Sequence, residues 1–157
     1  IRNKMQEGKM AGQVMAAVAG TIAFSVLYSV PRAYYSYCGF IGGAGWFLYC
    51  LLLPVCSPSE AALFAAILVV LLSRFFAVKE KCPVTIFLIS GIFPLVPGGG
   101  IYWTAYYIVT GEMELAAAKG FAAVKAAVAI VLAIVFVFQL PQKLFQMKWR
   151  ESKGRKS

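Results

Sequence analysis

Apolar runs long enough to cross a membrane constrain this chain more than any other feature. A helix needs about 20 mostly apolar residues to cross the hydrocarbon core of a bilayer. The 157-residue sequence holds five runs near this length, separated by short segments with prolines, glycines or charges, at positions 10–29, 37–54, 61–78, 84–109 and 115–140. We therefore predict an all-α polytopic membrane protein with about five transmembrane helices, built as a single transmembrane domain over residues 1–157.

The composition excludes several other classes of protein. Hydrophobic residues make up 61% of the sequence and charged residues 13%, and the mean hydropathy is +0.78. A soluble domain of this size could not cover its surface with so few polar groups. The sequence has no histidine, and its carboxylates and cysteines form no acid–base pair, C-x-x-C pair or metal-ligand pattern. We expect neither an enzyme nor a metal or other cofactor.

The net charge of +9 is placed to meet lipid headgroups rather than nucleic acid. Basic residues crowd the tail at 141–157, directly after the last apolar run. Cytoplasmic flanks of membrane helices are rich in Lys and Arg, so this tail, the Arg74–Lys81 connection and the Arg32 segment are predicted to be cytoplasmic. The connections at Cys56–Glu60 and Thr110–Leu115 are predicted to lie outside. Only the basic N-terminus disagrees with this five-span topology.

The fourth run contains a break, Pro94–Gly100, inside an uncharged apolar stretch. The segment reads PLVPGGG; its prolines lack backbone donors, and its glycines can adopt positive φ without strain. Unpaired backbone at that depth persists only where it is buried in protein or lines a polar cavity, as at the substrate sites of transporters. We predict a discontinuous helix whose second half begins near Ile101. The expected substrate-binding residues around the break are Pro94, Pro97, Gly98, Gly99, Gly100, Tyr102 and Thr104.

The same aromatic-rich segment also permits a structural interpretation. Tyr102 and Thr104 either supply hydroxyls to a ligand or belong to an interfacial aromatic belt. For Trp103 and Tyr107 the belt is the favoured interpretation. The break itself is either a binding site or a device for packing against a partner helix.

Lys125 is added to the expected binding residues because of its depth. The helix from Ala126 to Leu140 covers about 22 Å, less than the roughly 30 Å of the hydrocarbon core, so Lys125 is predicted to lie within the membrane. A lysine there binds a carboxylate, exchanges a proton, or pairs with a group on a partner subunit. Arg74 lies nearer to a helix end and is expected to snorkel to the interface, with a position facing a cavity as the alternative.

Small residues are spaced for close helix packing. Gly39 and Gly43 form a G-x-x-x-G pattern, Gly45–Trp46 follows it, and Ala118, Ala122 and Ala126 repeat at intervals of four. Small residues at this spacing let helix backbones approach closely in lipid. We expect tight packing within the chain, against a partner chain or in a homo-oligomer.

Two segments resemble the threonine/serine exporter family. The segment VPRAYYSYCGFIGGAGWFLY (Val30–Tyr49) is similar to the family's pattern of a proline and a basic residue, then small residues ending in Gly-Trp and Tyr. The segment FPLVPGGGIYWTAYYIVTGE (Phe93–Glu112) resembles its P-x-x-P-G block, followed by tyrosines and an acidic turn. Length, basic tail and span order are similar to those of the family's small, separately encoded subunit. The resemblance covers roughly residues 14–140.

The resemblance implies an inner-membrane exporter of small amino acids, with relatives implicated in dicarboxylate (succinate) export. It implies a two-component form in which a larger membrane subunit pairs with a small one. It marks Pro94, Pro97 and Gly98 as the family's signature break and Gly45–Trp46 as a packing signature, whereas Lys125 matches no family motif.

Two hypotheses for the function follow. The first is the small subunit of a secondary-active exporter of threonine and serine, or of related small carboxylates, driven by the proton gradient and working with the larger subunit. The second is a non-transporting scaffold or assembly subunit of a membrane complex, in which the break serves a partner helix. Efflux measured with this chain, its partner and both together separates the two.

Overall fold

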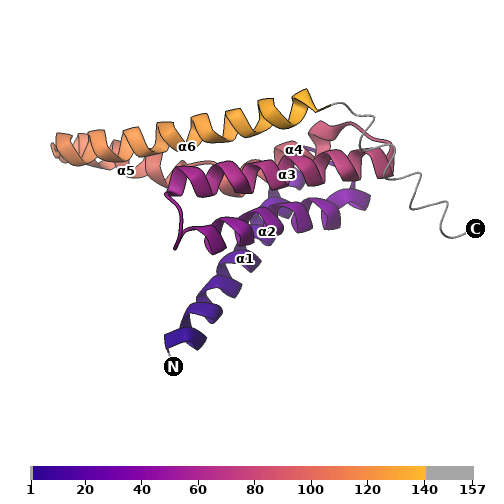
Figure 1. The fold of residues 1–157 in the computed structure, drawn as a ribbon, viewed down its shortest axis with the longest axis horizontal. Coiled ribbons are helices and arrows are strands. Elements are labelled where there is room, and N and C mark those ends of the chain that lie inside the picture. Colours follow the sequence, from indigo (N-terminus) through magenta and orange to yellow (C-terminus); the bar gives the residue numbers. More distant parts are fainter. Residues whose placement is uncertain (1, 141–157) are drawn as a thin grey trace, which may run out of the picture.

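The structure, a computed structural model, describes residues 2–140, with side chains from Met10 onward. The basic tail predicted for residues 141–157 lies outside the described residues. The described part is helical throughout and contains no strand (Figure 1). Its elements are α1 (Arg2–Leu27), η1 (Arg32–Tyr34), α2 (Tyr35–Leu52), α3 (Pro58–Glu80), α4 (Val84–Ile92), η2 (Phe93–Leu95), α5 (Gly98–Val109) and α6 (Met113–Gln139).

The helices confirm an all-α membrane protein. Three segments are long and apolar enough to cross a bilayer: Met10–Leu27 in α1, α3 and α6. The pair Val84–Leu95 and Gly98–Val109, bent by 46°, forms a fourth if it is counted as one span. The expected second span corresponds to α2, an 18-residue helix in which four glycines and three tyrosines lower the hydropathy. The total of five spans therefore stays a prediction.

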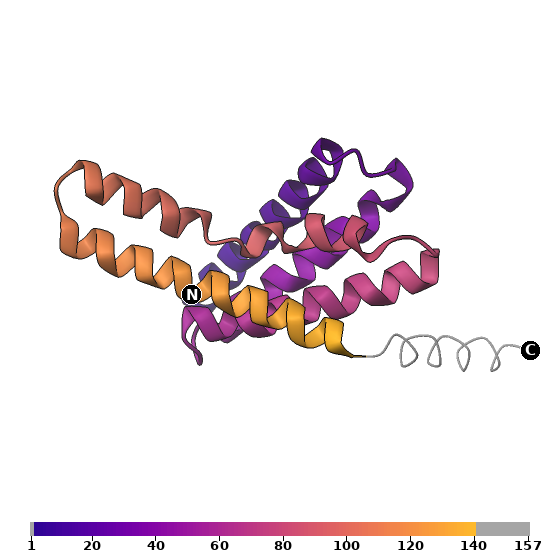
Figure 2. The ribbon, with the colours of Figure 1, turned by 90° about the horizontal axis from the view of Figure 1, so that it is seen from above.

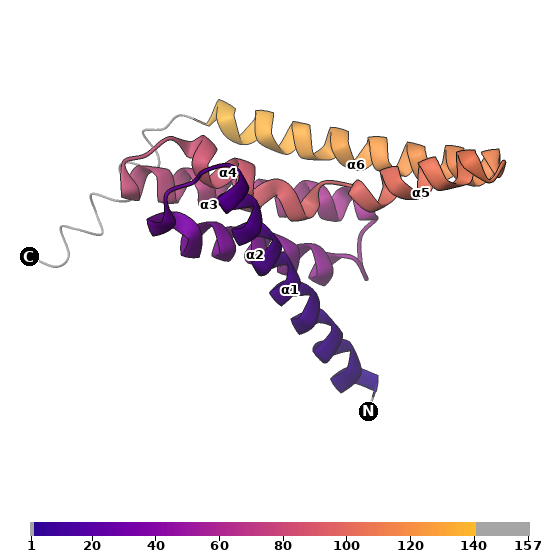
Figure 3. The same ribbon diagram turned by 180° about the vertical axis from the view of Figure 1, so that it is seen from behind.

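The connections gather at two opposite ends of the bundle. The α1–α2 turn, the α3–α4 turn and the end of α6 share one end, and the α2–α3 and α5–α6 connections lie toward the other (Figures 1 and 2). The connections predicted to be cytoplasmic thus share one end. This grouping is what an alternating topology requires. In Figure 3, α1 leans away from the other helices toward the N-terminus.

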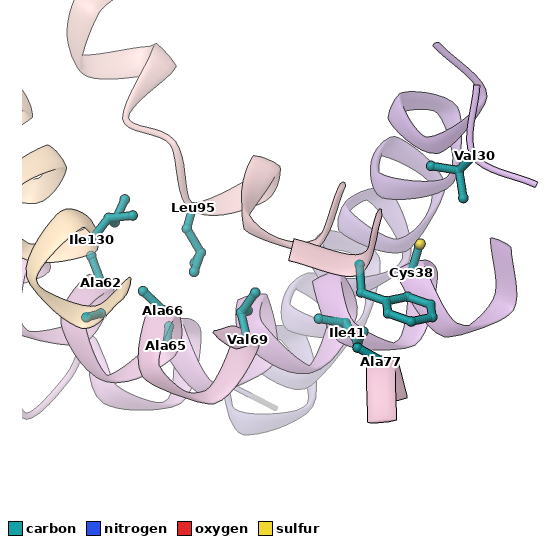
Figure 4. Packing of buried hydrophobic residues seen from close by; sticks show 12 residues of the cluster. Val30, Cys38, Ile41, Ala62, Ala65, Ala66, Val69, Ala77, Leu95 and Ile130 are labelled. Atoms are coloured by element: carbon teal, nitrogen blue, oxygen red, sulfur yellow. The ribbon is translucent and has the colours of Figure 1, made fainter. Parts of the chain in front are cut away.

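The core lies where α2, α3 and α4 meet. Ile41, Val69 and Phe87 are fully buried there, and Figure 4 shows Leu95 of η2 reaching into the same cluster. Gly91 is required at this junction, because a Cβ at that position would lie 2.6 Å from Ile41. Small residues therefore bring the first half of the broken helix close to α2.

The α3 helix begins at Pro58, three residues before the apolar run predicted at 61–78. Its N-cap is Ser57, with Pro58 in the first turn. The Ser57 and Glu60 side chains bond each other's backbone N–H groups in a capping box. The helix ends at Lys81, which adopts left-handed geometry with φ 54°.

The fourth run is broken, but the break lies slightly earlier than predicted. The α4 helix ends at Ile92, the 3-10 turn η2 follows, and α5 begins at Gly98 rather than near Ile101. The three glycines form the first turn of α5, and among the described glycines only Gly111 has a positive φ. The irregular segment is therefore Phe93–Pro97. None of these three glycines has left-handed backbone, and among them only Gly100 needs to lack a side chain, because its Cβ would lie 2.9 Å from that of Ala123.

The α5 helix and the first half of α6 form a projecting arm, residues 98–127 (Figure 2). Within the described residues, α6 is the main packing partner of α5. A Cβ at Gly100 would lie 2.9 Å from that of Ala123, and a Cβ at Gly120 would lie 3.2 Å from Thr104. These contacts hold the arm together, while the second half of α6 packs on α3.

Candidate functional site

The break leaves polar groups inside an apolar bundle. Val96 is extended (φ −60°, ψ 129°) and Pro97 has ψ 49°, so the helical hydrogen-bond ladder stops between η2 and α5. Pro94 has no N–H and cannot donate to the Ser90 carbonyl as a helical residue would. The Ser90 hydroxyl is itself fully buried and has no hydrogen-bond partner within the described residues.

A groove opens on the α1 side of the break. We call it the Pro94 groove; its volume is about 270 Å³, and it is lined by Gln13, Ala16, Ala17, Gly20, Trp46, Phe93 and Pro94. The lining is almost entirely apolar, apart from the Gln13 amide and the Trp46 indole. Its small residues on α1 leave room for a small ligand beside the break.

Two side chains give this groove its polar character. The Trp46 indole nitrogen is buried, and its N–H finds no acceptor in the part of the chain that the structure describes. A buried, unsatisfied donor is costly and marks a place where another molecule can supply the acceptor. The Gln13 oxygen accepts a hydrogen bond from the Cys50 thiol at 3.4 Å, which leaves its amide NH₂ as a donor.

The groove also adjoins a seam of buried polar side chains between α1, α2 and α4. Thr21 and Ser25 are fully buried and donate to carbonyls one turn earlier, to Ala17 at 2.7 Å and to Thr21 at 2.9 Å. The Cys38 thiol lies beside the Ser25 and Ser90 hydroxyls. Buried hydroxyls that bond backward along their own helix avoid a desolvation cost.

A second groove lies on the arm. We call it the Thr104 groove; its volume is about 370 Å³, and it is lined by Pro97, Ile101, Thr104, Ala105, Ile108, Gly120, Ala123, Val124 and Ala127. Its one hydroxyl, on Thr104, donates to the Gly100 carbonyl at 2.7 Å. The groove therefore offers shape and apolar surface, with little hydrogen bonding to a ligand.

The structure brings some of the expected site residues together and separates others. Pro94 lines one groove, and Pro97 and Thr104 line the other. Gly98 and Gly99 face open space at the start of α5, where no side chain caps the helix. Tyr102 is 63% exposed and lines neither of these grooves.

Trp103 lies with Tyr102, Tyr106 and Tyr107 in an aromatic cluster on α5. The Trp103 ring stacks on that of Tyr107 at 5.8 Å and meets the Tyr106 ring edge-on at 5.6 Å. Trp103 and Tyr106 are each nearly half exposed. This exposed cluster fits the predicted aromatic belt.

Lys125 is not part of the break. Ala123 packs on Gly100, and Lys125 follows two positions later, about 200° around the helix. Its side chain is exposed, with the ammonium 4.9 Å from the centre of the Phe121 ring. The helix thus turns Lys125 away from Gly100, and its assignment to the substrate site stays a prediction.

The buried cation in this bundle is Arg74. Only 4% of Arg74 is exposed, and its guanidinium donates to the Val137 carbonyl and lies 5.5 Å from the centre of the Phe138 ring. The expectation that it snorkels to the interface is wrong, because it bonds the C-terminal turn of α6 instead. The sequence pattern that could have predicted a buried cation was the single arginine inside a long apolar run.

The packing residues expected from the sequence meet neighbouring helices. A Cβ at Gly39 would lie 3.1 Å from Ile22, and one at Gly43 would lie 2.6 Å from Val18, so α2 approaches α1 closely. Gly45 lies against Val69 of α3. Trp46 packs against the core and beside Tyr49, with ring centres 5.2 Å apart, and lines the Pro94 groove as well.

Sequence reasoning missed Gln13 and the buried polar seam. Thr21 and Ser25 lie four residues apart and so share one face of α1, and Gln13 lies about two turns before Thr21. This spacing of polar residues within an apolar helix is the sequence pattern that could have predicted the seam. No group of three or more His, Cys, Asp or Glu side chains that could hold a metal ion occurs in residues 2–140.

Comparison with known proteins gives one match. A family model described as "Threonine/Serine exporter, ThrE" matches residues 13–139, from the Pro94 groove on α1 to the last residue of α6. No curated protein and no solved structure matches the chain.

Proposed function

We propose, on the premise that the chain belongs to the threonine/serine exporter family, that it is a subunit of a secondary-active exporter of threonine and serine or of related small carboxylates. The family is one of transporters and not of enzymes. The observation that carries the proposal is the broken span with a groove beside it, lined by Trp46, whose buried indole N–H has no acceptor among the described residues. Transporters use such breaks in helices to hold small polar substrates.

The Pro94 groove suits a small amino acid. Threonine and serine carry a carboxylate and a hydroxyl, and the Trp46 N–H can donate to either oxygen. The Gln13 NH₂ supplies a second donor on the facing helix. The groove wall at Ala16, Ala17 and Gly20 is apolar. Because the whole groove holds only about 270 Å³, it favours a ligand with a short side chain over one with a large side chain.

The energy source and the partner belong to the same proposal. The described carboxylates, Glu60, Glu80, Glu112 and Glu114, all lie at helix ends. A proton-coupled exporter needs a protonatable group within the membrane, so we propose that a larger membrane subunit supplies it. The chain is proposed to lie in the inner membrane with its C-terminus in the cytoplasm, because the basic connections share one end of the bundle.

A scaffold function is the second candidate. The observation that favours it is the projecting arm, in which α5 packs mainly on α6 and the large apolar side chains Ile101, Ile108 and Phe121 are exposed. In that case the bend at the break would orient the arm toward a partner chain, and the partner would carry out transport alone.

Efflux of labelled threonine, serine and succinate from vesicles tests the proposal. Vesicles would contain this chain alone, the larger subunit alone, or both, with equal amounts of each shown by immunoblotting. Efflux that requires both chains, depends on an imposed pH gradient and falls in the Trp46→Phe variant supports the exporter. Equal efflux with the larger subunit alone would reduce this chain to a scaffold.

A further inference from the structure

The buried polar seam continues from the Pro94 groove toward the end of the bundle that is proposed to face the cytoplasm. Thr21 and Ser25 of α1 and Ser90 of α4 are fully buried in it. The Cys38 thiol of α2 lies beside the Ser25 and Ser90 hydroxyls. The seam starts at the groove itself, because the Thr21 hydroxyl donates to the carbonyl of Ala17, which lines the groove. Groove and seam are therefore continuous along one side of α1.

The seam is closed in this structure. A Cβ at Gly42 would overlap the Thr21 hydroxyl, so α1 and α2 are in direct contact there. The groove stops one turn after Gly20, where the Phe24 ring stacks on that of Phe93 with ring centres 3.3 Å apart. A ligand in the groove is thus separated from the proposed cytoplasmic end by this aromatic pair and by the seam.

The hydroxyl groups of the seam do not tie α1 to its neighbours. The Thr21 and Ser25 hydroxyls both donate to carbonyls of α1 itself. The Ser90 hydroxyl is fully buried and has no hydrogen-bond partner within the described residues, a costly arrangement that water would relieve. Separating α1 from α2 and α4 therefore breaks neither of the two α1 bonds. It exposes hydroxyls that water solvates, at a lower cost than an apolar interface of the same size.

The position of α1 at the edge of the bundle permits such a separation. Within the described chain, α1 packs mainly on α2 and also touches α4 and η2. None of its described side chains belongs to the apolar core cluster. In Figure 3, α1 leans away from the other helices. The helix can therefore move, with its wall of the groove, while the core stays packed.

We infer that the polar seam is the cytoplasmic half of the substrate path, opened when α1 moves away from α2 and α4. Phe24 then separates from Phe93, and water and substrate pass between Thr21 and Ser25 on one side and Ser90 on the other. The structure represents the state that is closed to the cytoplasm. The inference rests on the proposed function, because a substrate of the Pro94 groove needs a route to the cytoplasm.

Labelling of Cys38 from the cytoplasmic side tests the inference without measuring transport. In a variant that keeps only this cysteine, a membrane-impermeant methanethiosulfonate reagent is added to inside-out vesicles from native membranes. The control is Ala77→Cys without other cysteines: Ala77 is a core residue of α3 and, like Cys38, lies three residues from the end of its helix. Cys38 is expected to react at least tenfold faster. Equal rates would overturn the inference.

Removing a hydroxyl tests whether water lines the open seam. Thr21→Val keeps the shape of the side chain but replaces the hydroxyl with a methyl group, so labelling of Cys38 is expected to slow at least threefold. Ser73→Ala is the control, because the Ser73 hydroxyl is also fully buried and donates one turn back, but on α3. It is expected to leave the labelling of Cys38 unchanged. Equal labelling in the two variants would show that the hydroxyls line no aqueous path and would overturn the inference.

A reversible cross-link tests the path during transport. Ser25→Cys places a second thiol beside Cys38 in a chain whose other cysteines are replaced. Copper phenanthroline is expected to join the two sulfurs, passing two electrons and two protons to dioxygen, and to stop threonine efflux until dithiothreitol reduces the bond. Ser25→Cys combined with Cys38→Ala should not respond to the oxidant.

The outcomes separate this inference from the proposed function. Efflux that continues through the cross-linked protein would overturn the inference. Absence of threonine efflux before oxidation would instead count against the proposed function, and the labelling of Cys38 would still decide whether the seam opens to the cytoplasm.

Discussion

The guanidinium of Arg74, on α3, donates a hydrogen bond to the backbone carbonyl of Val137 in the last turns of α6. The last carbonyls of a helix lack partners four residues on; that of Val137 accepts the Leu140 N–H at 3.2 Å, and the buried arginine adds a second, charged donor. The same guanidinium lies over the Phe138 ring. Arg74 thus anchors the half of α6 that packs on α3, and the other half is left to project as the arm.

Replacing Arg74 tests this anchor. Arg74→Met is expected to lower the free energy of unfolding by about 2 kcal/mol, because a carbonyl in a buried place loses a charged donor. Unfolding in detergent micelles, followed by circular dichroism, measures the change. Lys79→Met, at an exposed position of the same helix, is the control and should change stability by less than about 0.5 kcal/mol. Equal effects of the two substitutions would contradict the anchor.

The glycines at the start of α5 are expected to differ sharply from one another. Gly100→Ala should weaken the α5–α6 contact by about 1–3 kcal/mol, because the new Cβ lies 2.9 Å from the Cβ of Ala123. Gly99→Ala meets open space and should stabilise the helix start by about 0.5–1 kcal/mol. Both are measured by unfolding in micelles. If the two variants lose equal stability, the packing assigned to Gly100 is wrong.

Removing the unsatisfied donor tests the Pro94 groove. Trp46→Phe keeps an aromatic ring but deletes the buried N–H, so the half-saturation concentration for threonine efflux should rise about tenfold. Stability should stay the same or increase slightly, because an unpaired buried group has been removed. Trp103→Phe, on the exposed face of α5, is the matched control and should leave efflux unchanged. An unaltered half-saturation concentration in Trp46→Phe would remove Trp46 from the substrate site.

Two native cysteines report the topology. Cys56 lies in the α2–α3 connection and Cys82 in the α3–α4 turn, at opposite ends of α3. In single-cysteine variants, a membrane-impermeant maleimide added to intact cells should label Cys56 and not Cys82. In inside-out vesicles the labelling should be reversed. Labelling of Cys82 from outside would invert the proposed orientation.

The Cys82 thiol should also react slowly near neutral pH. Burial raises the pKa of this thiol, and the negative charge of Glu80 raises it further. Because only the thiolate attacks maleimide, a raised pKa leaves a smaller reactive fraction below that pKa. The labelling rate of Cys82 should therefore reach half of its maximum at a higher pH than that of a free cysteine. Glu80→Gln should lower the pKa and shift this profile toward lower pH.

The parts of the candidate site that could be predicted were local. Two prolines in an uncharged run are incompatible with a continuous helix, so the break near Pro94 and Pro97 followed directly from backbone chemistry. The role of the glycines could not be predicted from backbone chemistry in the same way. Glycine is compatible with both helical and left-handed backbone, and only the contact between Gly100 and Ala123 shows that close approach is what this position requires.

The class of the protein, most helix boundaries to within a few residues and the place of the break could be predicted from the sequence alone. These depend on hydropathy and on proline, which act along the chain. Only the tertiary structure decided which charge is buried and which is exposed. Arg74 and Lys125 each lie in apolar helices, and their contrasting environments depend on how α3 and α6 are rotated against their neighbours. That rotation is set by packing between segments distant in sequence, which no local pattern encodes.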